Sequence, residues 1–525
     1  MAAKKKTPMK AAPAEVGIAE GVTVRMFCQG LGDCFLLTIP QEGTRPYFIL
    51  IDCGVAMGTA GEPELMQQVT KKIAELTKDA ATGQSTIDLL VVTHEHRDHV
   101  SGFIHGQAEL AVIEFKKVWF AWTEDRGDTL ANELRAKHAK EKASLARAFA
   151  TASALAGPGA RSERRRLQSL AGVLAFYEPI LAAKGGKRVD VAQAMAEAGK
   201  LQKSGSPDTL MPGKVMLLPG AVDGTTARGV RVFILGPPHN ESTLRNINPS
   251  KKNPQTYEKE KAAGLMRSSL GMDWSWAAAL SSHAAAMQID VGQDTSGETE
   301  RAMPFDDKWR RPLKEVEKTN DDFFKNNYFS GDAQRRIDGD WLWAGAQRLA
   351  LYMETYTNNT SLALAFELPK SKKVLLFAAD AQVGNWLSWH DVDYKTDDER
   401  TLKAADLLAN TVLYKVGHHG SHNATLREKG LEMMSHPELV AMLPVETVAV
   451  LRLGYGEMPL KSLLTELDKR TEGRILHLDK KWTDGQAPGT WRPGMTKAQL
   501  AGETFIGGAD GRALYMELTV ADTAA

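Results

Sequence analysis

The stretch HEHRDH at residues 94–99 places three imidazoles and a carboxylate within six residues. It follows residues 87–93, an apolar run rich in branched side chains, and such a run predicts a buried strand of a parallel sheet. The cluster therefore lies where a strand ends and a loop begins, which is where open α/β folds build their ligand sites. This combination indicates an α/β fold.

The side chains of this cluster are of the types that bind transition metals. Imidazole nitrogens and carboxylate oxygens are ligands for zinc, manganese or iron. His94 and His96 are two residues apart and can converge on one ion, while Asp98 and His99 can reach a second ion beside it. The chain has 13 histidines in 525 residues, so three in this frame favour a metal site over a polar surface turn.

Two later strand ends carry the side chains that such a site still lacks. Residues 374–377 form a short apolar run that leads to Asp380, and residues 411–416 lead to the sequence GHHGSHN at 417–423. A carboxylate can bridge two ions, and one more imidazole can complete the second. We therefore expect Asp380 in the site, together with His418 or His419.

Composition excludes several classes of protein. The net charge is zero, which gives no overall attraction to nucleic acid or membrane, and no run of about 18 apolar residues predicts a transmembrane helix. The three cysteines, Cys28, Cys34 and Cys53, form no C-x-x-C pair and favour buried small hydrophobic side chains in a cytoplasmic protein. Residues 1–21 are rich in Ala, Lys and Pro and predict a flexible basic tail.

Changes in composition along the chain predict a core interrupted by two large, mainly helical insertions. The expected segments are the tail at 1–21, the first half of the core domain at 22–122, a basic helical insertion at 123–212, core strands at 213–240, a tryptophan-rich second insertion at 241–350, and the second half of the core domain at 351–525. Within the last segment we expect a strand at 448–453 and a helix at 459–470.

The first insertion carries an uneven charge. Residues 135–203 hold 14 basic and five acidic residues. A basic helical face can hold a polyanion such as nucleic acid, and an ordinary solvated helical face is the alternative. The run RSERRR at 161–166 is the part that would test this choice.

The whole arrangement resembles the metallo-β-lactamase fold superfamily, and within it the soluble hydrolase domain of ComEC-type DNA-uptake proteins. His94, His96, Asp98 and His99 resemble the superfamily's signature loop. Further similar pieces occur in the same order along the chain: Gly30–Asp33, Ile49–Gly54, Asn358–Leu362 and Tyr414–Ser421. The resemblance covers roughly residues 22–122, 214–240 and 358–425 and implies an αββα sandwich.

The resemblance also implies roles for individual residues. Two divalent ions, zinc or manganese, would share a bridging hydroxide that Asp98 orients, and Asp380 would bridge the ions. Similarity to phosphocholine esterases implies that His419 is a ligand and that His418 contacts phosphate. Asp52 would orient a ligand imidazole from behind.

Other parts of the sequence depart from the family pattern or leave two roles open. Ala379 precedes Asp380 where these domains usually have Gly. His239 follows a predicted strand and is the candidate for an additional mid-chain ligand, although the preceding Pro-Pro pair also occurs where no ligand follows. Lys415 and Ser421 are candidates for phosphate contacts, and Lys415 can equally be a strand-edge residue.

Three functions are compatible with these residues. The first is a metal-dependent phosphodiesterase, with a phosphorylated or nucleic-acid substrate. The second is a hydrolase of esters, thioesters or lactams that uses the same metals, because the fold does not decide the chemistry. The third is a non-catalytic, metal-stabilised binding protein whose insertions contact a protein partner. The ligand set favours an enzyme, and the 417–421 loop and the basic insertion favour the phosphodiesterase.

Overall fold

The computed structural model shows a mixed α/β protein. It describes residues 21–41, 45–141, 190–218, 229–247, 355–453, 457–480, 497–507 and 511–523, with short stretches between 249 and 353 and between 482 and 495. The RSERRR run and the tryptophans of the second insertion lie outside the described residues, as do residues 1–20. Gly21, expected in the tail, is the first residue of a strand.

Eight strands form the first sheet, in the order β16-β17-β1-β2-β3-β4-β5-β6. Neighbours from β16 to β3 pair antiparallel, and those from β3 to β6 pair parallel. The expected buried parallel strand before the histidine cluster is thus confirmed as β4. In chain order the strands are β1 Gly21–Phe27, β2 Phe35–Ile39, β3 Tyr47–Ile51, β4 Ser85–Val91, β5 Ile113–Ala121, β6 Asp208–Leu210, β16 Gln499–Leu500 and β17 Tyr515–Ala521.

Seven strands form the second sheet, in the order β15-β14-β13-β10-β9-β8-β7. Neighbours from β15 to β10 pair parallel, and those from β10 to β7 pair antiparallel. The members are β7 Val215–Leu218, β8 Val230–Gly236, β9 Ala363–Glu367, β10 Val374–Phe377, β13 Thr411–Lys415, β14 Val440–Leu443 and β15 Ile475–His477. A separate hairpin pairs β11 Tyr394–Lys395 with β12 Thr401–Leu402.

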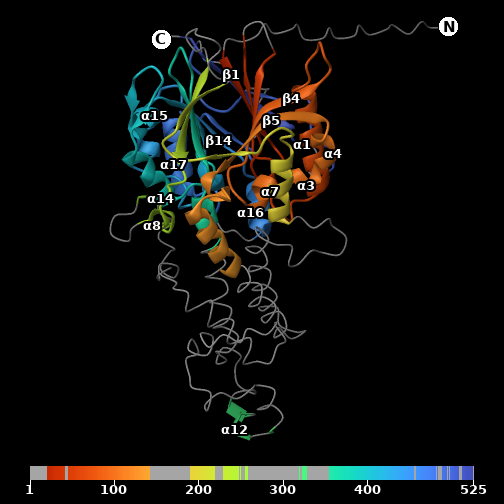
Figure 1. The fold of residues 1–525 in the computed structure, drawn as a ribbon, viewed down its shortest axis with the longest axis vertical. Coiled ribbons are helices and arrows are strands. Elements are labelled where there is room, and N and C mark those ends of the chain that lie inside the picture. Colours follow the sequence, from red (N-terminus) through yellow and green to blue (C-terminus); the bar gives the residue numbers. More distant parts are fainter. Residues whose placement is uncertain are drawn as a thin grey trace, which may run out of the picture.

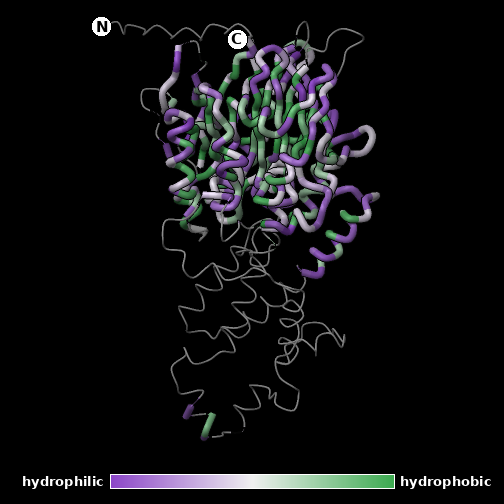
Figure 2. The backbone as a smooth tube through the Cα atoms, turned by 90° about the vertical axis from the view of Figure 1, so that its left-hand side faces the viewer, coloured by the Kyte–Doolittle hydropathy of each residue, from purple (hydrophilic) through white to green (hydrophobic). Residues whose placement is uncertain are grey.

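The two sheets pack face to face, and helices cover their outer faces (Figure 1). Successive residues of a strand point to opposite faces, and in β10 Leu375 and Phe377 join the core shared with the first sheet while Val374 and Leu376 join the core beneath the helices. The rings of Phe35, in the first sheet, and Phe377, in the second, pack edge to face with their centroids 5.5 Å apart. Figure 2 shows the hydrophobic residues gathered along these central strands.

The helices divide between the two outer faces. Helix α1 packs beside the first sheet through Leu65, Val69 and Ile73, at the spacing that predicted it. The helices with the first sheet are α1 Glu62–Leu76, α2 Arg97–Val100, α3 Gly102–His105, α4 Gln107–Leu110 and α7 Val191–Lys200. Those with the second sheet are α8 Glu241–Leu244, α14 Val383–Ser388, α15 Ala404–Ala409, α16 Thr447–Leu453 and α17 Lys461–Arg470.

Two secondary-structure predictions are wrong. The strand expected at 448–453 is helix α16, in which Val450 is buried while Val448 and Leu451 are exposed; a short apolar run does not separate helix from strand by itself. The insertion expected to be helical through residue 212 contains β6, which extends the first sheet beside β5. The last strand, β17, also joins the first sheet, where it pairs with β1.

Candidate metal centre

The histidine cluster lies at the carboxyl end of β4, between the two sheets. His94 and His96 occupy the loop after the strand, and Asp98 and His99 belong to the short helix α2. All four side chains are buried. His94 Nε2 lies 3.0 Å from His96 Nδ1, so the two imidazoles converge as their spacing predicted.

Asp380 approaches this cluster from the second sheet. It follows β10 by three residues, and its Oδ2 lies 3.9 Å from His94 Nε2 and 3.3 Å from His99 Nε2. The other oxygen, Oδ1, accepts a hydrogen bond of 3.1 Å from the backbone N–H of His418. One carboxylate oxygen of Asp380 therefore faces both parts of the cluster.

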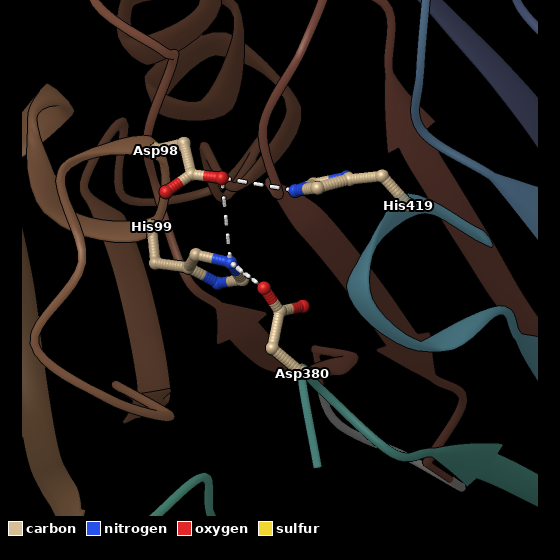
Figure 3. Close-up of side chains that lie close together, drawn as sticks. All are labelled: Asp98, His99, Asp380 and His419. Carbon is tan, nitrogen blue, oxygen red and sulfur yellow. Dashed lines mark hydrogen bonds and ion pairs between the residues drawn. The ribbon is translucent and has the colours of Figure 1, made fainter. Parts of the chain in front are cut away.

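His419 completes the arrangement from the loop after β13. Its Nε2 lies 2.9 Å from Asp98 Oδ2, and Figure 3 shows both side chains beside His99 and Asp380. The turn at 417–420 aims this imidazole inward through three successive left-handed residues, His418, His419 and Gly420. A Cβ at Gly420 would lie 2.6 Å from Pro459 Cβ, so this position requires glycine.

Among the described residues the structure brings together three buried groups of possible metal ligands. Asp33, Asp52 and His99 form one of them, behind the cluster, and the other two share Asp380. His94, His96 and Asp380 form the first group, and Asp98, His99, Asp380 and His419 form the second. Asp380 belongs to both. Nitrogen and carboxylate donors in this combination suit zinc and other first-row divalent metals, and these groups could hold two ions that share one carboxylate.

The unpaired atoms and buried charge of the site fit bound cations. Asp33, Asp52, Asp98 and Asp380 are each at most 2% exposed. Asp98 Oδ1 is buried without a hydrogen-bond partner among the described residues, and His99 Nε2 faces the carboxylates of Asp98 and Asp380 at 3.8 and 3.3 Å. Burial of unpaired polar atoms and charges is costly, and a metal ion on these atoms would remove that cost.

Electrostatics keep the carboxylates of Asp98 and Asp380 ionised. Burial alone would raise the pKa of Asp98, but the charge of His99 and the hydrogen bond with His419 lower that pKa to about 2. The pKa of Asp380 is likewise well below its ordinary value because His99 and Lys415 outweigh burial. Burial and the neighbouring imidazoles lower the pKa of His94, so this side chain is neutral. Burial lowers the pKa of His99, but the surrounding carboxylates, Asp380 and Asp33 foremost, raise it well above its ordinary value. His99 would therefore give up a proton when it binds a metal, because only the neutral imidazole is a ligand.

Asp52 supports His99 from behind, as the sequence predicted. Its Oδ2 lies 2.7 Å from His99 Nδ1 and also accepts a hydrogen bond from the hydroxyl of Thr93, while Oδ1 accepts one from the Thr93 backbone N–H. A carboxylate at Nδ1 favours the tautomer that carries its proton there. Nε2, which faces Asp98 and Asp380, is then free to bind metal.

A polar framework that sequence reasoning missed holds the Asp380 loop. The side chain of Asn359 accepts hydrogen bonds from the backbone N–H groups of Gln382 and Asn385. The Ser361 hydroxyl accepts one from the N–H of Asp380, and the backbone N–H of Leu362 donates to Thr93. Residues 358–362 carry a resemblance to the family, but their hydrogen bonds to a loop 19 to 26 residues away leave no periodic pattern in the sequence.

Other sequence candidates lie outside the two ligand groups. His239 Nε2 lies 2.9 Å from Asp128 Oδ2 and its ring packs against Trp122, so the structure does not bring it to the cluster. His418 Nε2 lies 3.3 Å from Asn358 Nδ2. Lys415 ends β13, which has paired strands on both sides. It is not open to a phosphate, because it is 1% exposed and its ammonium contacts Asp33 and Asp380.

Comparison with known proteins names no relative. No protein-family model and no curated protein matches the sequence.

None of the helices in the described part of the chain has the length and apolar character needed to cross a membrane. The three cysteines are buried free thiols, as predicted.

Proposed function

We propose that this chain is a metal-dependent hydrolase of the metallo-β-lactamase fold superfamily that cleaves phosphodiesters with two divalent ions, zinc or manganese. The observation that carries the proposal is the pair of buried ligand groups that share Asp380. A structural zinc site is normally one closed set of four ligands, whereas two adjacent groups with a common carboxylate are typical of hydrolytic centres. The face-to-face sheets with outer helices support the αββα assignment.

The residues divide into separate roles. His94 and His96 would hold one ion, His99 and His419 the other, and Asp380 would lie between them. Asp98, in the second group, would also orient the attacking water. When bound, the two ions would supply Lewis-acid activation and a water nucleophile at neutral pH. His418 is next to His419 in the same turn, and its imidazole would contact a substrate phosphate and the charge that develops on it.

The test is hydrolysis of bis-p-nitrophenyl phosphate by the full chain with added manganese or zinc. We expect turnover that requires metal and is lost in Asp98→Ala and Asp380→Ala. The matched control is Asp88→Asn, a buried aspartate on β4 that pairs with Arg45 away from the centre, and it should retain turnover.

Each other outcome separates the alternatives. Two bound ions without phosphodiesterase activity would favour ester, thioester or lactam substrates, which p-nitrophenyl acetate and a chromogenic lactam would test. Bound metal without any hydrolysis would favour the binding protein. A chain that binds no metal would refute the proposal. If the model substrate is cleaved, single-stranded and duplex DNA are the next substrates to compare.

A further inference from the structure

Lys415 is a buried cation directly behind the ligand groups. It is the last residue of β13 and is 1% exposed. Its ammonium donates to the backbone carbonyl of Ala379 at 3.2 Å and to Asp380 Oδ1 at 3.4 Å, and it forms a close ion pair with Asp33 Oδ2. A lysine ammonium has three N–H donors, and here three oxygens surround it.

The contact with Asp380 decides which of its oxygens faces the centre. Oδ1 is held by Lys415 Nζ and by the backbone N–H of His418. Oδ2 is therefore the oxygen directed at His94 and His99. Without the ammonium, one of the two restraints on Oδ1 is gone and the carboxylate can rotate.

The contact with Ala379 restrains the peptide that leads into Asp380. Ala379 has a φ of 48°, in the left-handed region that residues other than glycine rarely adopt. Its carbonyl accepts from both Lys415 Nζ and the N–H of His418. The same lysine thus holds the backbone and the side chain at the shared ligand.

The contact with Asp33 joins the two sheets behind the centre. Asp33 lies in the loop between β1 and β2 of the first sheet, and its backbone N–H donates to the Asp98 carbonyl at 3.0 Å. Gly32 before it has a φ of 143°, and a Cβ there would lie 2.7 Å from that same carbonyl. The Asp33–Lys415 pair therefore connects the backbone at Asp98 with the strand that precedes His419.

We propose that Lys415 is a positioning residue that fixes the Asp380 carboxylate between the two ligand groups, with Asp33 holding the ammonium in place. The inference rests on the metal centre proposed above. It predicts that Lys415 acts on metal affinity and coordination geometry without touching a metal ion itself, as residues behind metal ligands do.

The test compares zinc affinity and stoichiometry in the wild type, Lys415→Met and the double variant Asp33→Asn/Lys415→Met. Zinc is measured by competition with a chromophoric chelator and by elemental analysis. We expect Lys415→Met to bind zinc about 10–100-fold more weakly. The double variant also removes the buried charge that Lys415→Met leaves on Asp33, so its thermal stability should recover while its zinc affinity stays low. Its visible spectrum with cobalt should differ from that of the wild type.

Lys373→Met is the matched control, because Lys373 is a largely buried lysine that pairs with Glu438 Oε2 at 2.7 Å. It should keep wild-type affinity and cobalt spectrum. If Lys415→Met or the folded double variant keeps both, Lys415 merely balances the charge of Asp33 and the inference is overturned. A wild-type chain without bound metal would instead refute the proposed function, and the inference with it.

Discussion

Replacement of Asp52 by Asn tests whether the proton on His99 is fixed from behind. Asp52 is fully buried and has a φ of 55°, and Asn tolerates this left-handed backbone well. The substitution preserves shape, so its effect is confined to hydrogen bonding. An amide oxygen can replace Oδ1 toward the backbone N–H of Thr93, but the NH₂ group then faces His99 Nδ1 at the 2.7 Å contact.

The amide donor would force His99 into the wrong tautomer. With NH₂ at this position, Nδ1 must accept, and the ring proton moves to Nε2, the atom that faces Asp98 and Asp380. The flipped amide is no better, because its NH₂ would then face the N–H of Thr93. Loss of such a supporting partner weakens metal binding about 10–100-fold, which corresponds to about 1.4–2.7 kcal/mol.

Zinc affinity by chelator competition is the assay, with Asp88→Asn as the control. Asp88 is a buried aspartate on β4 that accepts from the N–H of Phe48 at 2.9 Å, away from the ligand groups. Both variants should lower the melting temperature, but only Asp52→Asn should weaken zinc binding. Equal zinc affinity in Asp52→Asn and wild type would show that the contact with Asp52 does not set the tautomer of His99.

Two further predictions concern stability. Ala379→Gly should raise the free energy of unfolding by up to about 1.5 kcal/mol, because the left-handed backbone costs an L-residue about 1–2 kcal/mol and glycine loses about 0.5–1 kcal/mol in chain entropy. A lower urea midpoint would contradict this. Burial and Glu95 raise the pKa of Glu124 from 4.5 to about 7. This carboxyl therefore favours the folded state below pH 4.5, and that contribution is lost as the pH rises through 7. In metal-free protein, the melting temperature of Glu124→Gln minus that of the wild type should increase between pH 5 and pH 8. A difference that stays constant over this pH range would refute the prediction.

Sequence patterns predicted the first half of the candidate site because its possible ligands are close together in the sequence. Residues 94–99 follow one strand directly, and the branched apolar run before them predicts that strand wherever the rest of the chain goes. Asp380 and His419 also follow predicted strands, and β10 and β13 are neighbours whose carboxyl ends lie at the same edge. Parallel pairing of β10 and β13 explains why two of the strand ends lie together, and the packing of the two sheets brings the end of β4 to them.

Secondary structure was harder to predict where local propensity and tertiary pairing disagree. The sequence VAML of β14 contains alanine and methionine, which have little preference for strands, and it is a strand because β13 and β15 pair with it on both sides. The sequence TVAVLRL of α16 is richer in branched residues, and yet it is a helix. Pairing with strands on both sides, which the segment itself does not encode, decides the case of β14.

Ala379 shows that the residue next to a proposed ligand in the sequence predicts the backbone conformation there less well than the hydrogen bonds around it do. Glycine usually precedes the shared aspartate in the domains that this chain resembles, and alanine there is unfavourable at a left-handed φ. In this structure the Ala379 carbonyl accepts hydrogen bonds from Lys415 Nζ and from the N–H of His418, both over 35 residues away in sequence. Those contacts hold the peptide in the conformation that glycine would adopt freely. Alanine before Asp380 is therefore compatible with Asp380 as the proposed shared ligand. The sequence alone could not predict this, because only the fold brings Lys415 and Asp33 next to Ala379 and Asp380.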